Sequence, residues 1–195
     1  MKSLYIVFFS FSNIALLWAQ QGIKVDTQTI HFLNPYGNVC VGKDAGGSSV
    51  GDYNTFIGQY SGMNNTTGNY NSSVGAYSLY FNTQGGGNTT NGFYALNSNT
   101  FGNYNVSIGY FSLFLNSTGS QNTALGYQTL YHNTEGIQNT ACGADALNLN
   151  TSGYQNAAFG NEALFSNTTG ERNTAVGYDA LLFNGTGNNN TAIGQ

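Results

Sequence analysis

The stretch N-T-A-V-G at residues 173–177 returns as N-T-A-I-G at residues 190–194, 17 residues later. The same phase extends back through the chain, because an Asn followed four residues later by Gly recurs at every step of 17. These pairs begin at Asn54, Asn71, Asn88, Asn105, Asn122, Asn139, Asn156, Asn173 and Asn190, and an earlier pair, Asn38/Gly42, precedes the first by 16 residues. Self-similarity at a fixed period is the sequence signature of a repeat architecture. We number the unit from position 1, the Asn, to position 17.

Two further positions are constant in all eight full copies, an Asn at position 12 and a Gly at position 15. Asn tolerates a left-handed backbone and bonds its own main chain, and Gly supplies positive φ, so this block predicts a tight turn. The Gly at position 5 predicts a bend in the same way. Positions 6 to 11 stay open between a second strand and a short helical or irregular turn, since their Ala-Leu pair favours helix.

Two apolar columns are expected to form the core. Position 4 is apolar in every copy except Asn91, and position 9 is Leu from Leu79 to Leu181, with Gly62 in the first full copy. If positions 1 to 5 form a strand, the period of two also turns position 2 inward and the small position 3 outward. A 17-residue unit buries these columns only by stacking on its neighbours. The sequence therefore predicts an all-β fold, a parallel β-solenoid or β-roll of about ten coils over residues 38–195, with short helical turns as an option.

Composition excludes several classes of protein. Only 12 of the 195 residues are charged and the net charge is −4, so a basic nucleic-acid surface is not expected. The chain is 40% hydrophobic and 14% aromatic, which is too apolar for a disordered linker. Two His, two Cys and scattered acids leave little material for a catalytic site, so neither enzymatic activity nor a cofactor is expected.

The N-terminus has the features of an export signal. Residues 1–19 combine Lys2, an apolar middle and a small last residue, Ala19, as in a cleaved secretory signal peptide. Residues 20–37 are then expected to cap the solenoid, and the repeat breaks off in mid-unit at Gln195. The expected location is extracellular or on a cell surface, with no membrane span in the mature chain.

Few residues suggest chemistry. Cys40 and Cys142 lie six coils apart, too far for a disulfide within one chain, whereas Cys40 pairing between chains stays open. Cys142 is expected to be buried, because it occupies position 4. Asp145, Glu162 and Asp179 share position 7 in successive coils. This acidic column predicts a solvated face rather than a cation site, and the two His have no partner at metal-ligand spacing.

Two columns are candidate partner-facing surfaces. In the earlier copies position 7 is aromatic, and such a stripe can stack on a ligand such as a sugar or pack against a neighbouring chain. Position 3 in the later copies is a small, uncharged column, which suits close approach of another surface. The candidates are Tyr60, Tyr77, Tyr94 and Phe111 at position 7, and Ala124, Ala141, Ala158 and Ala175 at position 3.

The N-T-A-[VIL]-G segment, clearest at residues 173–177 and 190–194, resembles the strand motif of the head repeats of trimeric autotransporter adhesins, the YadA-like class. The longer unit also resembles repeats of bacterial surface and phage-fibre-like proteins, which often carry a C-terminal chaperone domain. The resemblance covers roughly residues 38–195 and implies a left-handed roll, three chains side by side and a small residue that faces the trimer. The unit here is longer than in that family, and Thr stands at position 2.

Three functions follow as hypotheses. The first is an exported bacterial surface or fibre protein that adheres to a host or neighbouring surface, protein or glycan, through weak contacts repeated along a rod. The second is a passive spacer or fibre shaft that carries another domain. The third is ice binding through the Thr column at position 2, which Val106 and Ala157 interrupt and which the predicted strand turns inward.

Overall fold

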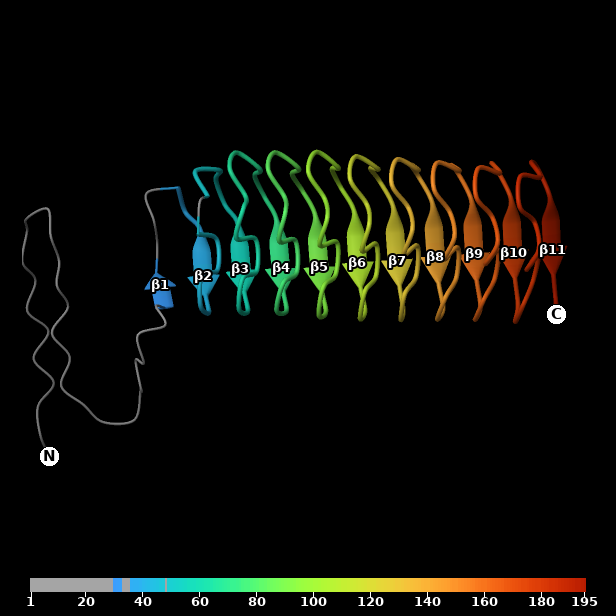
Figure 1. Ribbon diagram of the computed structural model, residues 1–195, viewed down its shortest axis with the longest axis horizontal. Helices are drawn as coiled ribbons and strands as arrows, with labels where there is room; N and C mark the ends of the chain where they lie inside the picture. Colours follow the sequence, from blue (N-terminus) through green and yellow to red (C-terminus); the bar gives the residue numbers. More distant parts are fainter. Residues whose placement is uncertain (1–29, 33–35, 48) are drawn as a thin grey trace, which may run out of the picture.

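The computed structural model describes residues 30–32, 36–47 and 49–195, and it forms a rod built from a single 11-stranded sheet whose strands follow the order of the sequence (Figure 1). The strands are β1 Ile30–Phe32, β2 Val39–Val41, β3 Thr55–Ile57, β4 Ser72–Val74, β5 Thr89–Asn91, β6 Val106–Ile108, β7 Thr123–Leu125, β8 Thr140–Cys142, β9 Ala157–Phe159, β10 Thr174–Val176 and β11 Thr191–Ile193. The ten strands from β2 to β11 are parallel, and β1 pairs antiparallel with β2. The predicted parallel β-solenoid of 17-residue coils is confirmed.

Every parallel pair joins the same positions of consecutive units. In β7 and β8, for example, Thr123 lies opposite Thr140 and Leu125 lies opposite Cys142. The earlier copy, shorter by one residue, joins the sheet in the same register. Within the described ranges there is no helix, so positions 6 to 11 take the irregular-turn alternative. None of these residues therefore lies in a helix long and apolar enough to cross a membrane. The predicted signal peptide and most of the predicted cap lie outside the described residues.

The core is made by positions 3, 8 and 9, which corrects the predicted orientation of the strand. Position 3 is fully buried, as at Ala141, whereas the apolar position 4 is exposed, as at Ile108 with 41% of its surface accessible. Position 2 is outward as well. Leu at position 9 is buried as predicted, and each such Leu contributes about 2 kcal/mol by leaving water. The alternation of period two was predicted correctly, but its inward face was assigned to the wrong positions.

In the first coils, the buried Ser and Thr hydroxyls form hydrogen bonds with one another. Ser61 donates to Ser73 Oγ at 2.9 Å, and Thr90 donates to the same oxygen at 2.9 Å. Ser73 and Ser78 are joined by their hydroxyls at 2.6 Å. A buried hydroxyl without a partner costs roughly 1–3 kcal/mol, so this chain of bonds makes Ser and Thr acceptable where later coils carry Ala.

Three positions of each coil adopt a left-handed backbone. In coils that carry no Gly there, φ lies near +50° to +60° at positions 7, 9 and 17, for example 55° at Tyr77, 53° at Leu79 and 58° at Tyr70. Such a conformation costs a residue other than Gly about 1 kcal/mol or more. Tyr and Leu do not favour it locally, so the stacking of the coils imposes the turn.

The two constant Gly positions serve different purposes. Gly at position 5 has positive φ, for example 139° at Gly143, as the predicted bend requires. Gly at position 15 does not lie in the left-handed region, which corrects the second prediction. A Cβ at Gly153 would instead collide with Asn150 Oδ1 and with the carbonyl oxygen of Gly170 in the next coil. Close approach of backbone and side chain requires Gly at this position.

The constant Asn residues form two buried ladders that join the coils. At position 1, the backbone N–H of Asn139 donates to Asn122 Oδ1 at 3.0 Å. At position 12, Asn150 Nδ2 donates to Asn133 Oδ1 at 2.7 Å. The carbonyl oxygen of Gly153 accepts from both ladders, from Asn139 Nδ2 at 2.8 Å and from Asn150 Nδ2 at 3.1 Å. The constancy of these positions therefore follows from the buried hydrogen bonds that each Asn makes with the neighbouring coil, because its replacement would leave buried polar groups unpaired.

Candidate functional site

The rod exposes an uncharged sheet surface, which we call the strand face and define as the outward side chains at positions 2 and 4 of β2 to β11. None of these side chains is Asp, Glu, Lys or Arg. Position 4 forms an aliphatic and aromatic column in which Ile57, Ile108 and Phe159 are 38%, 41% and 43% exposed. The sequence pattern had placed the position 4 side chains in the core, and it had marked position 2 only as a Thr column for ice binding.

The strand face also carries the Thr column and Cys142. Position 2 is Thr in β3, β5, β7, β8, β10 and β11, and these side chains are outward and partly or fully exposed. Cys142 is exposed, which corrects its predicted burial, since position 4 points to solvent. Cys40, at position 3, is buried, and burial raises the pKa of its thiol. Both cysteines are free thiols.

The alanines expected to face a partner lie inside the coil. Ala124, Ala141, Ala158 and Ala175 are fully buried in the hydrophobic core. Only a small side chain fits between the strand and the Leu at position 9. A neighbouring chain cannot reach this column without opening the coil, so these four residues are not partner-facing.

The second exposed surface is an aromatic stripe, which we define as the rings at positions 6, 7 and 10 from Tyr60 to Tyr131. The position 7 rings are half-buried and stack along the rod, with centroids 4.9 Å apart for Tyr77 and Tyr94 and 5.3 Å apart for Tyr94 and Phe111. At position 6, Tyr110 stacks on Tyr127 at 5.8 Å. Each such pair contributes roughly 0.5–1.5 kcal/mol.

This stacking decides what the stripe can bind. Tyr94 has a stacked ring on both faces, from Tyr77 and from Phe111, whereas Tyr60 is tilted by 43° against Tyr77. The coil after Phe111 carries Gln128 at position 7. A sugar that stacks on an aromatic residue needs the ring face. Tyr60, Tyr77, Tyr94 and Phe111 therefore pack against one another in their own chain, and both faces of the ring of Tyr94 are closed to a stacked sugar.

The acidic column continues the stripe towards the C-terminus. Burial raises the pKa of Asp145, and a hydrogen bond from Asn148 Nδ2 at 2.9 Å partly offsets this. Across the described part of the chain, no three His, Cys, Asp or Glu side chains come together as metal ligands would. His132 is half-buried, and its Nδ1 lies 3.2 Å from Asn148 Oδ1.

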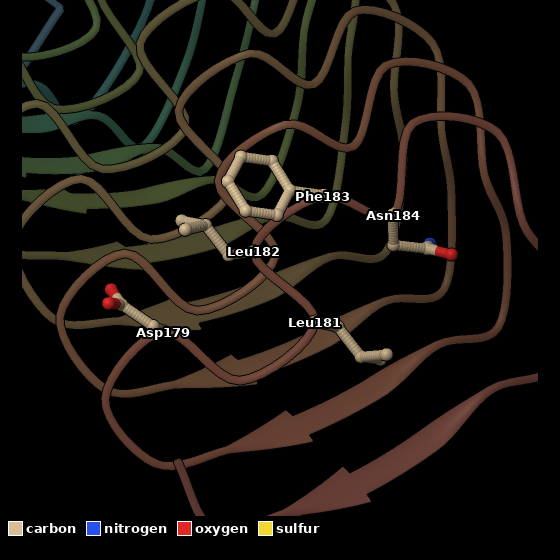
Figure 2. Close-up of a pocket in the computed structure, with 5 residues that line it drawn as sticks. All are labelled: Asp179, Leu181, Leu182, Phe183 and Asn184. Carbon is tan, nitrogen blue, oxygen red and sulfur yellow. The ribbon is translucent and has the colours of Figure 1, made fainter.

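A shallow hollow lies at the C-terminal end of the stack (Figure 2). Asp179, Leu181, Leu182, Phe183 and Asn184 line it, and 85% of the surface of Phe183 is exposed. Asp179 Oδ1 is buried without a hydrogen-bond partner. Leu181 in this hollow is only partly buried, whereas its counterparts in earlier coils, Leu147 and Leu164, are fully buried.

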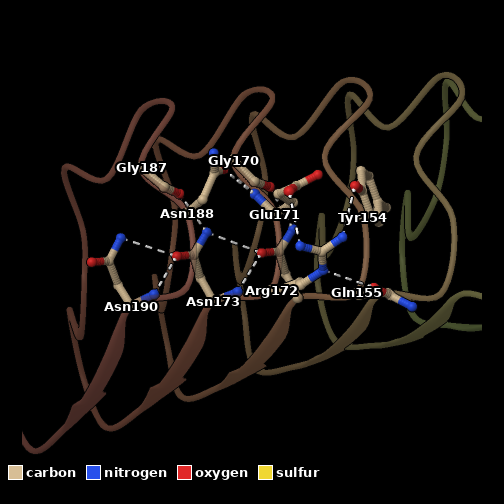
Figure 3. Close-up of polar contacts among 10 residues, drawn as sticks. Tyr154, Gln155, Gly170, Glu171, Arg172, Asn173, Gly187, Asn188 and Asn190 are labelled. Atoms are coloured by element: carbon tan, nitrogen blue, oxygen red, sulfur yellow. Dashed lines mark hydrogen bonds and ion pairs between the residues drawn. The ribbon is translucent and has the colours of Figure 1, made fainter.

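The turn side of the last coils carries the chain's one described ion pair (Figure 3). Arg172 lies 3.3 Å from Glu171 and donates to Tyr154 Oη, also at 3.3 Å. The pKa of Tyr154 is raised, mainly by a hydrogen bond with Glu171 and to a smaller extent by burial. Arg172 is half exposed, so this pair contributes little to stability and offers only a small charged patch.

Comparison with protein-family models, with curated proteins and with solved structures finds no match to this chain. Its functional assignment therefore depends on the geometry of the exposed faces.

Proposed function

We propose that the chain is an exported surface or fibre protein of bacterial type, which acts in adhesion through the repeated surface of its rod. The observation that carries this proposal is the strand face, where equivalent side chains recur in every coil at about 4.8 Å, the spacing of paired strands. Weak contacts that are held in one rigid body bind together, and the avidity grows with their number. The partner is a host or neighbouring surface, protein or glycan.

The resemblance to YadA-like head repeats supports export and a homo-oligomer of three chains as parts of the same proposal. No catalytic role and no cofactor are included, because the sequence holds only two His, two Cys and 12 charged residues.

Adhesion by avidity is tested by changing the number of coils. Beads coated with the full chain, or with chains that lack residues 122–138 or 122–172, would be counted on epithelial cells, bacterial cells and glass. Each deletion removes whole 17-residue units. We expect bead retention under flow to fall steeply with each coil removed. Retention that is independent of coil number would reject adhesion and favour the spacer or fibre shaft. Such a shaft needs length and stiffness but no surface that binds a partner.

Ice binding is the second candidate, and the outward orientation of position 2 favours it. The predicted inward orientation was one of the two arguments against it, and the structure reverses this orientation. The Thr column remains interrupted by Val106 and Ala157. We expect an ice-binding chain to inhibit recrystallisation, and Thr123→Tyr with Thr140→Tyr to abolish the effect. An unchanged ice grain size in the presence of the native chain rejects this candidate.

A further inference from the structure

The strand face is an uncharged sheet face that no other described part of the chain covers. We propose that it packs against the strand face of a second copy of this chain, sheet against sheet. The column at position 4 is aliphatic or aromatic in every coil from β3 to β11 except at Asn91 and Cys142. No charged side chain in the face would have to be desolvated or would repel an identical surface.

The period of the face selects a second copy as its occupant. Side chains of one column lie about 4.8 Å apart, because the strands pair in register. A surface with another spacing loses this register within a few coils, whereas a second copy keeps it over the whole rod. Flat sheets pack face to face about 10 Å apart with their inner side chains interdigitated. An identical face also satisfies the self-complementarity that symmetric assembly requires.

The shape and size of the face fit a reversible assembly. The two best-formed hollows in the described part of the chain are lined by residues outside positions 2 and 4. Ten parallel strands of three residues span roughly 43 Å by 10 Å, or about 430 Å². A stable interface takes about 800 Å² from each partner. The exposed position 6 rings, Phe93, Tyr110, Tyr127 and Tyr178, follow the strands along one border.

This inference rests on the homo-oligomer of the proposed function and says which surface forms it. The contact between chains is made by positions 2 and 4, and not by the buried alanines at position 3. The inference does not depend on adhesion itself. A chain that stays single yet still holds beads to cells would overturn the inference, and with it the oligomer, but it would leave adhesion through the repeated surface standing.

Light scattering coupled to size exclusion tests the packing. The full chain is compared with Ile108→Lys/Val176→Lys on the strand face, and with Thr118→Lys/Thr186→Lys, which adds the same charges to exposed turn positions of the same two coils. Asn91 shows that a strand tolerates a polar residue at position 4. We expect two chains per particle at tens of micromolar for the native and turn variants, and one for the face variant. A native chain that is single at every concentration, or a face variant that associates as the native chain does, overturns the proposal.

Cys142 supplies a second measurement that does not depend on particle mass. It is exposed at position 4 of β8, whereas Cys40 is buried, so maleimide labelling reports on the face through Cys142. We expect labelling of the native chain to slow at least tenfold as its concentration rises through the association range, and to stay fast in Ile108→Lys/Val176→Lys. An unreactive Cys40 shows that the variant is folded. Labelling of the native chain that is equally fast at all concentrations contradicts the packing.

Discussion

In the coil that starts at Asn54, the large core side chain is Phe56 at position 3 and the small residue is Gly62 at position 9. In the coils from Asn71 onwards the two sizes are exchanged, with the large Leu at position 9 and the small Ser, Thr or Ala at position 3. Phe56 is fully buried, and a Cβ on Gly62 would collide with its ring. The coil interior therefore has a nearly fixed volume, which either side of the coil can fill.

The exchange predicts compensation between the two residues. Gly62→Leu alone overfills the coil and is expected to cost about 3 kcal/mol of unfolding free energy, and Phe56→Ala alone leaves a cavity that costs roughly 3–5 kcal/mol. The double variant restores the arrangement of later coils. Gly62 has a φ of 58°, close to the 53° of Leu79, so Leu fits the backbone. We expect the double variant to lie within about 1 kcal/mol of the native chain in denaturant unfolding, which additive losses would contradict.

The combination of Phe56 with Gly62 is also the sequence signal from which the inward face of the strand could have been predicted. The sequence predicted the repeat, the buried Leu column and the turns at the constant Asn and Gly residues. It did not predict which face of the strand turns inward, because alternation defines two faces without naming the buried one. An apolar column at position 4 suggested the core, whereas the narrow coil admits only small side chains opposite Leu. A Phe that appears only where this Leu is Gly identifies position 3 as the inner one.

Within an element, the left-handed turns show the limit of local preference. Position 7 is Tyr77, Phe111 or Asp145 in different coils, yet φ stays between 55° and 57° at these three residues. No propensity of these side chains predicts such a turn. The conformation follows from hydrogen bonds between coils, for example from the N–H of Asp145 to the carbonyl of Tyr127 at 2.9 Å.

The corner after each strand predicts a sharp contrast between two Gly residues. Gly143 has a φ of 139°, and a Cβ there would collide with the carbonyl of Gly160 in the next coil. Gly143→Ala is therefore expected to lower the free energy of unfolding by about 3 kcal/mol or more. A Cβ at Gly185 would meet nothing within 4 Å. Gly185→Ala should be neutral or stabilise by up to about 1 kcal/mol. Equal effects of both variants in thermal unfolding would show that the corner does not require Gly.

At the scale of the whole molecule, each coil contacts the coil before it and the coil after it. All parallel strand pairs are between consecutive strands, and both Asn ladders step by 17 residues. Stability in such an array is close to a sum of coil terms and neighbour terms. At the N-terminal end, β1 pairs antiparallel with β2 and covers the edge that would otherwise be open.

Nearest-neighbour stacking predicts that a whole coil can be removed but half a coil cannot. Deleting residues 122–138 brings Asn139 directly after Gln121, so that Val106 meets Thr140 and Leu113 meets Leu147 at matching unit positions. We expect a folded rod that is shorter by about 4.8 Å in small-angle scattering, with a proportionally lower denaturant m-value. Deleting residues 122–130 instead joins position 17 of one unit to position 10 of the next. This deletion removes a strand and breaks both Asn ladders, so the circular dichroism spectrum of the variant should lose the native signal. If the 17-residue deletion unfolds the chain as completely as the nine-residue deletion does, the coils are not interchangeable and stability is not a sum over neighbours.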